Sequence, residues 1–294
     1  MEDKIVIAQA FDGQVRIRSI HSTHLVEEAR QKHHLMATSA AALGRIMTVT
    51  AILASELKDP KAKVTSIFNG EGPIGTVLAQ GDGAGHIRGF VGNPSVYLAR
   101  EDGHLDVGAA IGQKGTLKVI KDLGLKEPFS GVVDIQSGEV GDDFAYYFAV
   151  SEQTPSIVAV GVLVNPKGDI RVAGGMIFQL MPKASEETIC ALEEIAHTMK
   201  PITELIDEGL TPEEMIYAYV PKAQILGEKE VIWDCPCSKE HYFQAMTTLS
   251  DQEIQEMIEE DHGAGVTCQF CNTTYQFTEE ELKEILYAKH MENR

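Results

Sequence analysis

Four of the five cysteines in this 294-residue chain form two short pairs, which restrict how its C-terminal part can fold. The pairs are Cys235-x-Cys237 and Cys268-x-x-Cys271, with residues 238–267 between them. Each pair brings two sulfurs within ~2.3 Å of one ion, and two such pairs complete a tetrahedral zinc site with four thiolate ligands. The pattern therefore predicts one zinc ion that ties two distant parts of the chain together.

The C-terminal segment is too acidic and too short to be stable on its core alone. Residues 231–294 hold 13 acidic and 4 basic residues, so they carry −9 of the formal net charge of −19. A core of this size supplies at most ~3 to 5 kcal/mol, whereas zinc on four thiolates contributes ~10 to 16 kcal/mol of folding free energy. We therefore expect the segment to unfold without its metal. Oxidation of the sulfurs would remove the thiolate ligands and, with them, the long-range tie.

Loss of zinc on oxidation would make the site a redox switch. Three other uses of the cysteines are alternatives to it. An iron–sulfur cluster also takes four thiolates, although a C-x-C pair is less typical of ferredoxin spacings. A thioredoxin-like C-x-x-C begins a helix after a strand, whereas Cys268 and Cys271 are expected in a turn between two strands. A purely structural zinc site uses the same residue types at the same spacing and stays open as an alternative.

The first part of the chain has the pattern of an α+β domain built on a mostly antiparallel sheet. Alternating apolar and polar residues on both sides of Asp12-Gly13 predict a β-hairpin. Residues 24–57 follow a helical periodicity, and residues 63–180 consist of short β segments separated by Gly-rich turns. We assign residues 1–181 to an N-terminal α+β core domain.

Helix-start signals dominate the next region, residues 182–230, which we assign to a helical linker. Ser185 opens one helix, and Thr211 with Glu214 forms a capping box that opens another. Cys190 lies between apolar neighbours in the first of these helices and is expected to be a small buried residue.

Residues 231–294 are assigned to a small C-terminal redox-switch zinc-binding domain of the ββα type. Its expected elements are a strand–turn–strand over residues 265–277 and two helices that begin at capping boxes, Ser250 with Glu253 and Thr278 with Glu281.

Composition and missing motifs argue against several classes of function. A net charge of −19 repels phosphate backbones, so nucleic acid is not an expected partner. We expect a cytoplasmic protein, because no apolar run reaches the ~20 residues of a membrane span and no leader pattern is seen. The stretch Gly70–Gly75, GEGPIG, matches a dinucleotide fingerprint but continues as strand instead of opening a helix. Without a nucleophile, phosphate-binding or metalloprotease motif, the chain is not expected to be an enzyme.

The cysteine pairs and several other segments together resemble the 33 kDa chaperonin family, the redox-regulated heat-shock holdases of bacteria. The resemblance covers essentially the whole chain. It is carried by CPC, CQFC, LGRIMTVTAILAS, GPIGTVLAQGDGAGHIRGFVGNP, YYFAVSEQTPSIVAVGVLV and AGGMIFQLMPKA.

The resemblance implies an ATP-independent chaperone that is dormant when it is reduced and holds one zinc ion on its four paired cysteines. It further implies that oxidative stress joins Cys235 to Cys237 and Cys268 to Cys271 and releases the zinc. The C-terminal module and the linker would then unfold, bind unfolding client proteins and allow the activated chain to form a homodimer. The apolar linker residues expected to become exposed are Leu192, Ile195, Met199, Leu205 and Ile206.

Two functions from other classes remain as alternatives. A zinc-ribbon module with a constitutive partner would keep its metal under mild oxidation. A thiol–disulfide oxidoreductase would turn over a disulfide substrate.

Overall fold

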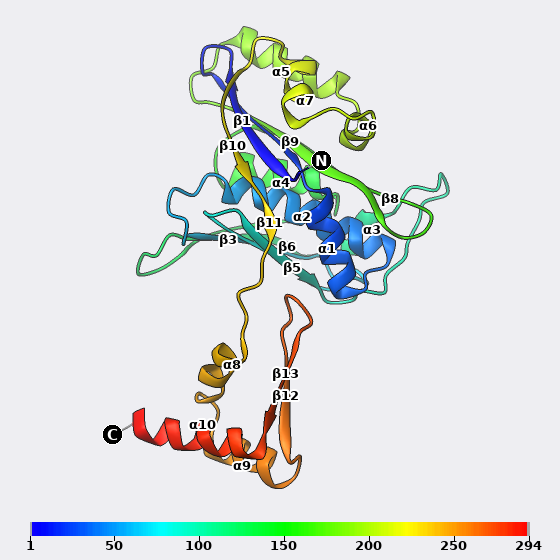
Figure 1. Ribbon diagram of the computed structural model, residues 1–294. Helices are drawn as coiled ribbons and strands as arrows, with labels where there is room; N and C mark the ends of the chain where they lie inside the picture. The colour runs from blue at the N-terminus through cyan, green and yellow to red at the C-terminus, as the bar shows by residue number, and fades with distance from the viewer. Residues whose placement is uncertain (1, 293–294) are drawn as a thin grey trace. The chain divides into compact units, whose positions relative to one another are not determined.

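A computed structural model describes residues 2–292 and has the predicted α+β architecture (Figure 1). The chain divides into two compact units, Met1–Asp234 and Cys235–Arg294. Residues 182–230 belong to the first unit, and their separate role as a linker stays a prediction.

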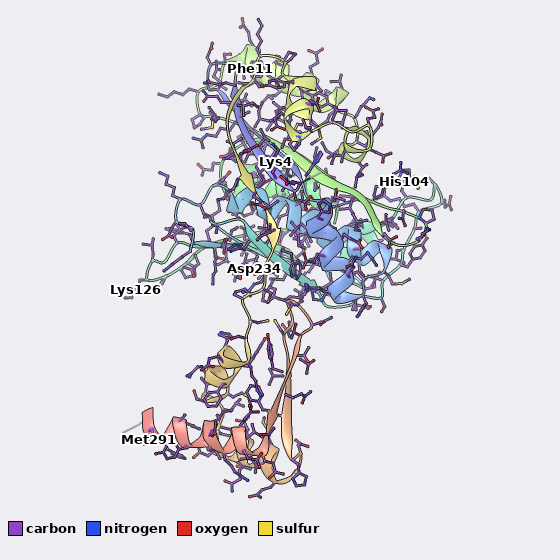
Figure 2. The ribbon with its side chains drawn as sticks, viewed as in Figure 1. Lys4, Phe11, His104, Lys126, Asp234 and Met291 are labelled. Carbon is purple, nitrogen blue, oxygen red and sulfur yellow. The ribbon has the colours of Figure 1, made fainter. Side chains whose placement is uncertain are left out.

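The first unit contains a five-stranded sheet in which every neighbouring pair of strands is antiparallel. Its β1–β2 hairpin turns at Phe11 (Figure 2), Asp12 and Gly13, all with positive φ, which confirms the hairpin predicted from Asp-Gly. The strand order is β10-β1-β2-β9-β8, with bounds β1 Lys4–Ala10, β2 Val15–His21, β8 Ser156–Val164, β9 Ile170–Leu180 and β10 Gln224–Glu230.

A second sheet of the first unit has six strands, and all its pairs are antiparallel except β11 with β5. The GEGPIG stretch connects β3 to β4 and opens no helix, in agreement with its rejection as a nucleotide loop. A side chain at Gly70 would lie 2.4 Å from the Ile111 carbonyl oxygen, so close backbone packing requires this glycine. The order is β11-β5-β4-β3-β6-β7, with bounds β3 Lys63–Asn69, β4 Val77–Asp82, β5 His86–Val91, β6 Thr116–Asp122, β7 Phe129–Asp134 and β11 Ile232–Trp233.

Helices fill the layer between the two sheets (Figure 1). The helical region predicted over residues 24–57 consists of two helices, because His34 adopts a left-handed conformation and ends the first one. By length and composition, α2 is the one helix in the described part of the chain that could cross a membrane, but 89% of it is buried inside the fold, as in a core helix. The bounds are α1 Thr23–His33, α2 Ala37–Ala54, α3 Val107–Ile111 and α4 Val140–Val150.

Aromatic packing joins this helical layer to the six-stranded sheet. Phe144 on α4 is fully buried, and its ring meets that of Phe68 on β3 edge-to-face with centroids 5.4 Å apart. We expect Phe144→Ala to lower the free energy of unfolding by ~3 to 5 kcal/mol, because the cavity adds to the lost burial. A urea titration that follows the fluorescence of Trp233, the single tryptophan, tests this. Phe129→Ala is the matched control, because Phe129 is 59% exposed and its loss should change stability little.

Three helices cover the outer face of the five-stranded sheet and form a second apolar cluster with it (Figure 1). The predicted caps are confirmed: Ser185 accepts a hydrogen bond from the Thr188 N–H, and Thr211 and Glu214 form a reciprocal capping box. The helices are α5 Glu186–Thr198, α6 Ile202–Asp207 and α7 Pro212–Tyr219.

Two features of residues 182–230 differ from the sequence-based expectation. Residues 224–230 are not helical but form β10, because they pair with the free edge of β1. Cys190 is exposed, since it lies on the face of α5 away from the buried Leu192 and Ile195. The prediction of a buried thiol there was wrong.

The second unit combines a hairpin with three helices. The capping boxes predicted at Ser250/Glu253 and Thr278/Glu281 are both present. Among the described residues, its apolar cluster has five buried side chains, Met246, Ile254, Phe277, Leu282 and Ile285. The elements are α8 Lys239–Met246, α9 Asp251–Glu259, β12 Gly263–Thr267, β13 Thr274–Thr278 and α10 Glu279–Glu292.

Candidate metal centre

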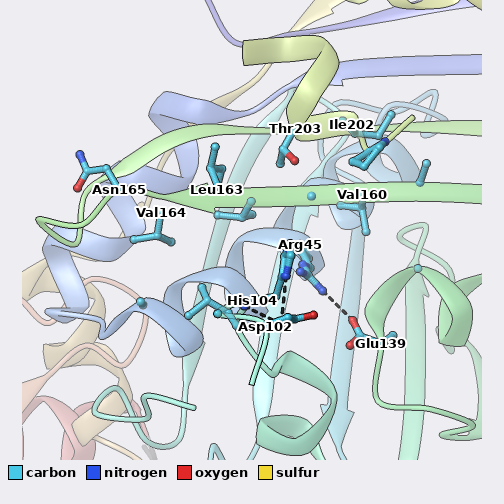
Figure 3. A pocket seen from close by; sticks show the side chains of 18 of the residues that line it. Arg45, Asp102, His104, Glu139, Val160, Leu163, Val164, Asn165, Ile202 and Thr203 are labelled. Atoms are coloured by element: carbon cyan, nitrogen blue, oxygen red, sulfur yellow. Dashed lines mark hydrogen bonds and ion pairs between the residues drawn. The ribbon is translucent and has the colours of Figure 1, made fainter. Parts of the chain in front are cut away.

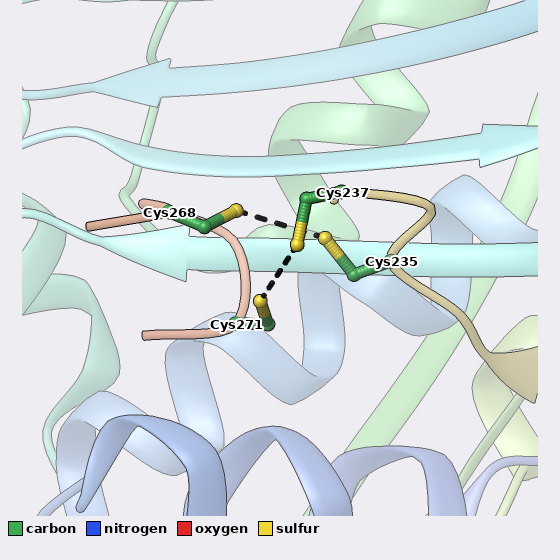
Figure 4. Close-up of side chains that lie close together, drawn as sticks. All are labelled: Cys235, Cys237, Cys268 and Cys271. Atoms are coloured by element: carbon green, nitrogen blue, oxygen red, sulfur yellow. Dashed lines mark hydrogen bonds between the residues drawn. The ribbon is translucent and has the colours of Figure 1, made fainter. Parts of the chain in front are cut away.

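The four paired cysteines converge at one point of the second unit (Figure 4). Their sulfurs all lie within 4.8 Å of one another. The Sγ atoms of Cys235 and Cys268 are 3.7 Å apart, and those of Cys237 and Cys271 are 3.3 Å apart. None of the four forms a disulfide, so the two ends of a 37-residue segment meet here without a covalent bond between them.

This sulfur arrangement fits a tetrahedral zinc ion. Four sulfurs at ~2.3 Å from a central ion lie ~3.8 Å from one another by tetrahedral geometry. The observed separations scatter around that value. The residues that would hold the ion are Cys235, Cys237, Cys268 and Cys271, and when bound it would supply a positive centre that holds all four as thiolates.

The second pair is positioned by the turn between β12 and β13, as the sequence predicted. The Cys268 N–H donates to the Thr273 carbonyl oxygen at 2.9 Å, and the Asn272 N–H donates to the Cys268 carbonyl oxygen at 2.9 Å. Asn272 closes the turn with φ 56°, a left-handed conformation that asparagine tolerates well. The turn therefore orients both sulfurs of the C-x-x-C segment toward the same side.

The first pair is positioned by the start of α8. Residues 234–238 have no regular secondary structure, and the proline in the C-x-C segment favours an extended backbone at Cys235. The chain becomes helical directly after Cys237, because Ser238 caps α8 by accepting a hydrogen bond from the His241 N–H.

The electrostatic surroundings give the thiols of the cluster different pKa values. Burial by itself raises the pKa of Cys268, but hydrogen bonds from the Tyr242 hydroxyl and from backbone N–H groups of the turn lower it to about 6. Burial raises the pKa of Cys237 to about 12 and outweighs the opposing hydrogen bond with Tyr275. Like charges this close do not ionise together unless a positive charge compensates them. A divalent cation provides that compensation, so the donor set fits a metal ion.

Two tyrosines complete the site and were not singled out by sequence reasoning. The Tyr275 hydroxyl lies 3.2 Å from the Cys237 sulfur and donates to the Cys237 carbonyl oxygen at 3.0 Å. The Tyr242 and Tyr275 rings pack with centroids 5.4 Å apart. Their positions in the sequence could have pointed to them: Tyr242 lies one turn into the helix after the first cysteine pair, and Tyr275 lies four residues after the second pair.

The other sequence candidates stay outside the cluster. Cys190 is in the first unit and does not take part. Among the described residues, the group that could hold a metal contains the four cysteines and no histidine.

The fold and the site together define a class of protein: an α+β body followed in sequence by a small unit in which four cysteine side chains converge. Comparison with known proteins agrees. The family model described as "Hsp33 protein" matches residues 3–278. The chain is 47% identical over 288 residues to the 33 kDa chaperonin of Staphylococcus carnosus strain TM300. The aligned residues cover 97% of this chain and 98% of that protein.

A second relative and a solved structure give the same result. The 33 kDa chaperonin of Staphylococcus aureus strain Newman is 45% identical over 287 residues, 97% of this chain and 98% of that protein. The crystal structure of the 33 kDa chaperonin (heat shock protein 33 homolog) from Thermotoga maritima has a TM-score of 0.90 at 35% identity, over 98% of this chain and 99% of that one. The chain therefore belongs to the Hsp33 family.

Proposed function

We propose that this chain is a redox-regulated, ATP-independent holdase chaperone that is inactive when reduced and loaded with one zinc ion. Membership of the Hsp33 family supports the chaperone function. The observation that carries the regulation is the convergence of four cysteine sulfurs in a unit whose buried apolar cluster has five side chains among the described residues.

The small core makes the second unit depend on its metal. A core of this size is worth at most ~3 to 5 kcal/mol, and a zinc ion on four thiolates contributes ~10 to 16 kcal/mol. The net negative charge of the segment lowers the stability of its folded state further, because most of its acidic residues repel one another on a small surface. Loss of the ion therefore removes most of the free energy that holds the unit together.

Oxidation would remove the ligands directly. Two thiolates lose two electrons to the oxidant, such as peroxide or hypochlorous acid, and form one S–S bond, so neither sulfur remains an anionic ligand. We propose that Cys235 pairs with Cys237 and Cys268 with Cys271, and that reductant reverses both steps.

Client binding would follow if the apolar side chains of residues 182–230 separated from the five-stranded sheet. Leu192, Ile195, Leu205 and Ile206 are buried against the five-stranded sheet, and Met199 packs at the margin of the same cluster. If residues 182–230 melt after the second unit has opened, these side chains and the sheet face under them become exposed and offer apolar surface to unfolding proteins.

We further propose that the activated chain forms a homodimer in the cytoplasm and neither catalyses a reaction nor binds nucleic acid. The net charge of −19 supports the last point, because it disfavours phosphate backbones.

An aggregation assay tests the proposal. Reduced, zinc-loaded chain should fail to suppress light scattering by a chemically unfolded client protein, whereas peroxide-treated chain should suppress it, and dithiothreitol should reverse the gain. Equal suppression in both states would exclude the switch. Retention of zinc under peroxide would favour a zinc-ribbon module, and turnover in an insulin-reduction assay would favour an oxidoreductase.

A further inference from the structure

A buried imidazole lies between the five-stranded sheet and the helices that cover its outer face. His21 is the last residue of β2 and is only 2% exposed. Alternate residues of a strand share a face, and Val15 and Ile17 of β2 belong to the apolar cluster that the sheet forms with α5–α7. His21 therefore faces the same helices, in the interior of the cluster's boundary and not toward solvent.

Two glycines allow α6 to pack closely on the sheet next to this ring. Thr203 of α6 lies beside β8 (Figure 3), and a side chain in place of Gly161 of β8 would come within 2.8 Å of the Thr203 Cγ2 atom. A side chain in place of Gly174 of β9 would come within 2.5 Å of the Ile206 Cδ1 atom, and Gly174 is the register partner of His21. The helix can approach this closely because neither strand has a side chain at these points.

The same part of the interface contains polar atoms that make no hydrogen bond. The His21 Nε2 and Ser19 Oγ atoms are both buried and have no hydrogen-bond partner among the described residues. Ser19 precedes His21 by two residues and so shares its face of β2. Each of these atoms loses its bonds to water on docking and gains none in exchange, which lowers the stability of the docked helices.

The charged groups around this end of β2 form ion pairs with one another, and none of the ion pairs among the described residues includes His21. The pairs are Lys4 of β1 with Glu213 of α7, Arg171 of β9 with Asp207 of α6, and Asp3 with His24 of α1. A positive charge on the His21 ring would therefore find no unpaired carboxylate among them.

Burial is the largest influence on the pKa of His21 and lowers it below its ordinary value. The positive charges of Lys4 and of the chain's amino group also lower this pKa, whereas a hydrogen bond with the Leu210 backbone and the negative charge of Glu213 raise it. Below pH ~6.5, an exposed histidine binds a proton that this buried ring rejects. The docked state is therefore fully stable above that pH and loses stability as the pH falls toward the lowered pKa.

The place of Leu210 in the chain identifies the helices that respond. Leu210 lies in the short connection between α6, which ends at Asp207, and α7, which begins at Pro212. α6 packs on β8 and β9, and α7 packs on β1 and β2. Movement away from His21 at this connection therefore affects both helices.

We propose that His21 makes the docking of α6 and α7 on the five-stranded sheet sensitive to pH, so that protonation of its ring releases both helices while the second unit keeps its zinc. The residues involved lie in the first unit and include no cysteine, so acid would act without an oxidant. Only the use of the released surface by a chaperone rests on the proposed function.

Amide hydrogen exchange on the full reduced, zinc-loaded chain tests the inference. The opening equilibrium of α6 and α7 is measured from pH 7.5 to pH 5.5 and corrected for the intrinsic pH dependence of exchange. We expect it to rise at least about threefold over this range and by no more than about tenfold per pH unit, the limit for one proton. Zinc content is assayed in the same samples and should stay constant.

Two variants separate protonation from packing. His21→Gln keeps a neutral polar side chain that binds no proton, and it should abolish the rise. Gly161→Ala is the control, because its methyl group presses on Thr203. It should increase the opening of α6 by a similar factor at every pH and leave the rise in place. NMR titration of the His21 ring in the wild type should give a pKa below the ordinary value, a readout that depends on neither variant.

Four outcomes would overturn the inference. They are an absent rise in the wild type, an equal rise in His21→Gln, a His21 pKa at or above its ordinary value, and loss of zinc over the pH range in which the helices open. None of these measurements involves oxidation or a client protein. The proposed function fails separately, if the oxidised wild type does not suppress aggregation.

Discussion

Removal of zinc is expected to unfold residues 235–294 while residues 2–181 keep their fold. Among the described residues, the second unit has one cluster of five buried apolar side chains, whereas the first has two extensive clusters around its sheets. Withdrawing ~10 to 16 kcal/mol of metal-linked folding free energy from a unit whose core is worth ~3 to 5 kcal/mol leaves the unfolded state favoured. The same withdrawal does not touch the contacts within residues 2–181.

Amide hydrogen exchange, measured before and after addition of a strong zinc chelator, checks this result. Amides of β12, β13 and α8–α10 should lose their protection, and those of β1–β9 should keep it. Cys268→Ser should give the same pattern without chelator, because it removes the most buried of the four thiols. Cys190→Ser is the matched control: its thiol is exposed and distant in sequence, so zinc content and protection should not change. Full protection of the second unit after chelation would contradict the prediction.

Features that depend on neighbours in sequence could be predicted from the sequence. The Asp-Gly hairpin and the capping boxes at Thr211, Ser250 and Thr278 are all present, because each is decided within about four residues. The C-x-C and C-x-x-C segments are equally local. Their convergence followed from the chemistry of one ion that needs four ligands.

Features that depend on distant partners could not be predicted. Residues 224–230 have weak strand character and become β10 only because β1 offers an open edge. The exposure of Cys190 depends on which face of α5 meets the sheet, and its apolar neighbours in sequence did not reveal that face.

Oxidation of the zinc-loaded chain is expected to join Cys235 to Cys237 and Cys268 to Cys271, although the shortest sulfur separations are in the other combination. Crossed disulfides would close loops of about 35 residues and constrain the unfolded chain by about 4 kcal/mol each, which would keep the unit tied together. The adjacent pairs close loops of three or four residues and contribute only ~1.5 to 2 kcal/mol each. Once the ligands begin to oxidise and the unit opens, only partners close in sequence stay close in space.

Disulfide mapping and a zinc assay on the same peroxide time course decide between the two pairings. The chain is alkylated, digested without reduction and analysed by mass spectrometry, in a Cys190→Ser background that prevents exchange with the exposed fifth thiol. Adjacent pairs should accumulate with release of one zinc ion per chain and should be reduced quickly by dithiothreitol. The Cα atoms of a C-x-C segment are up to ~7 Å apart when extended, at the limit of disulfide geometry, so that bond is strained. Crossed pairs with a still-protected second unit would mean that oxidation locks this unit instead of opening it.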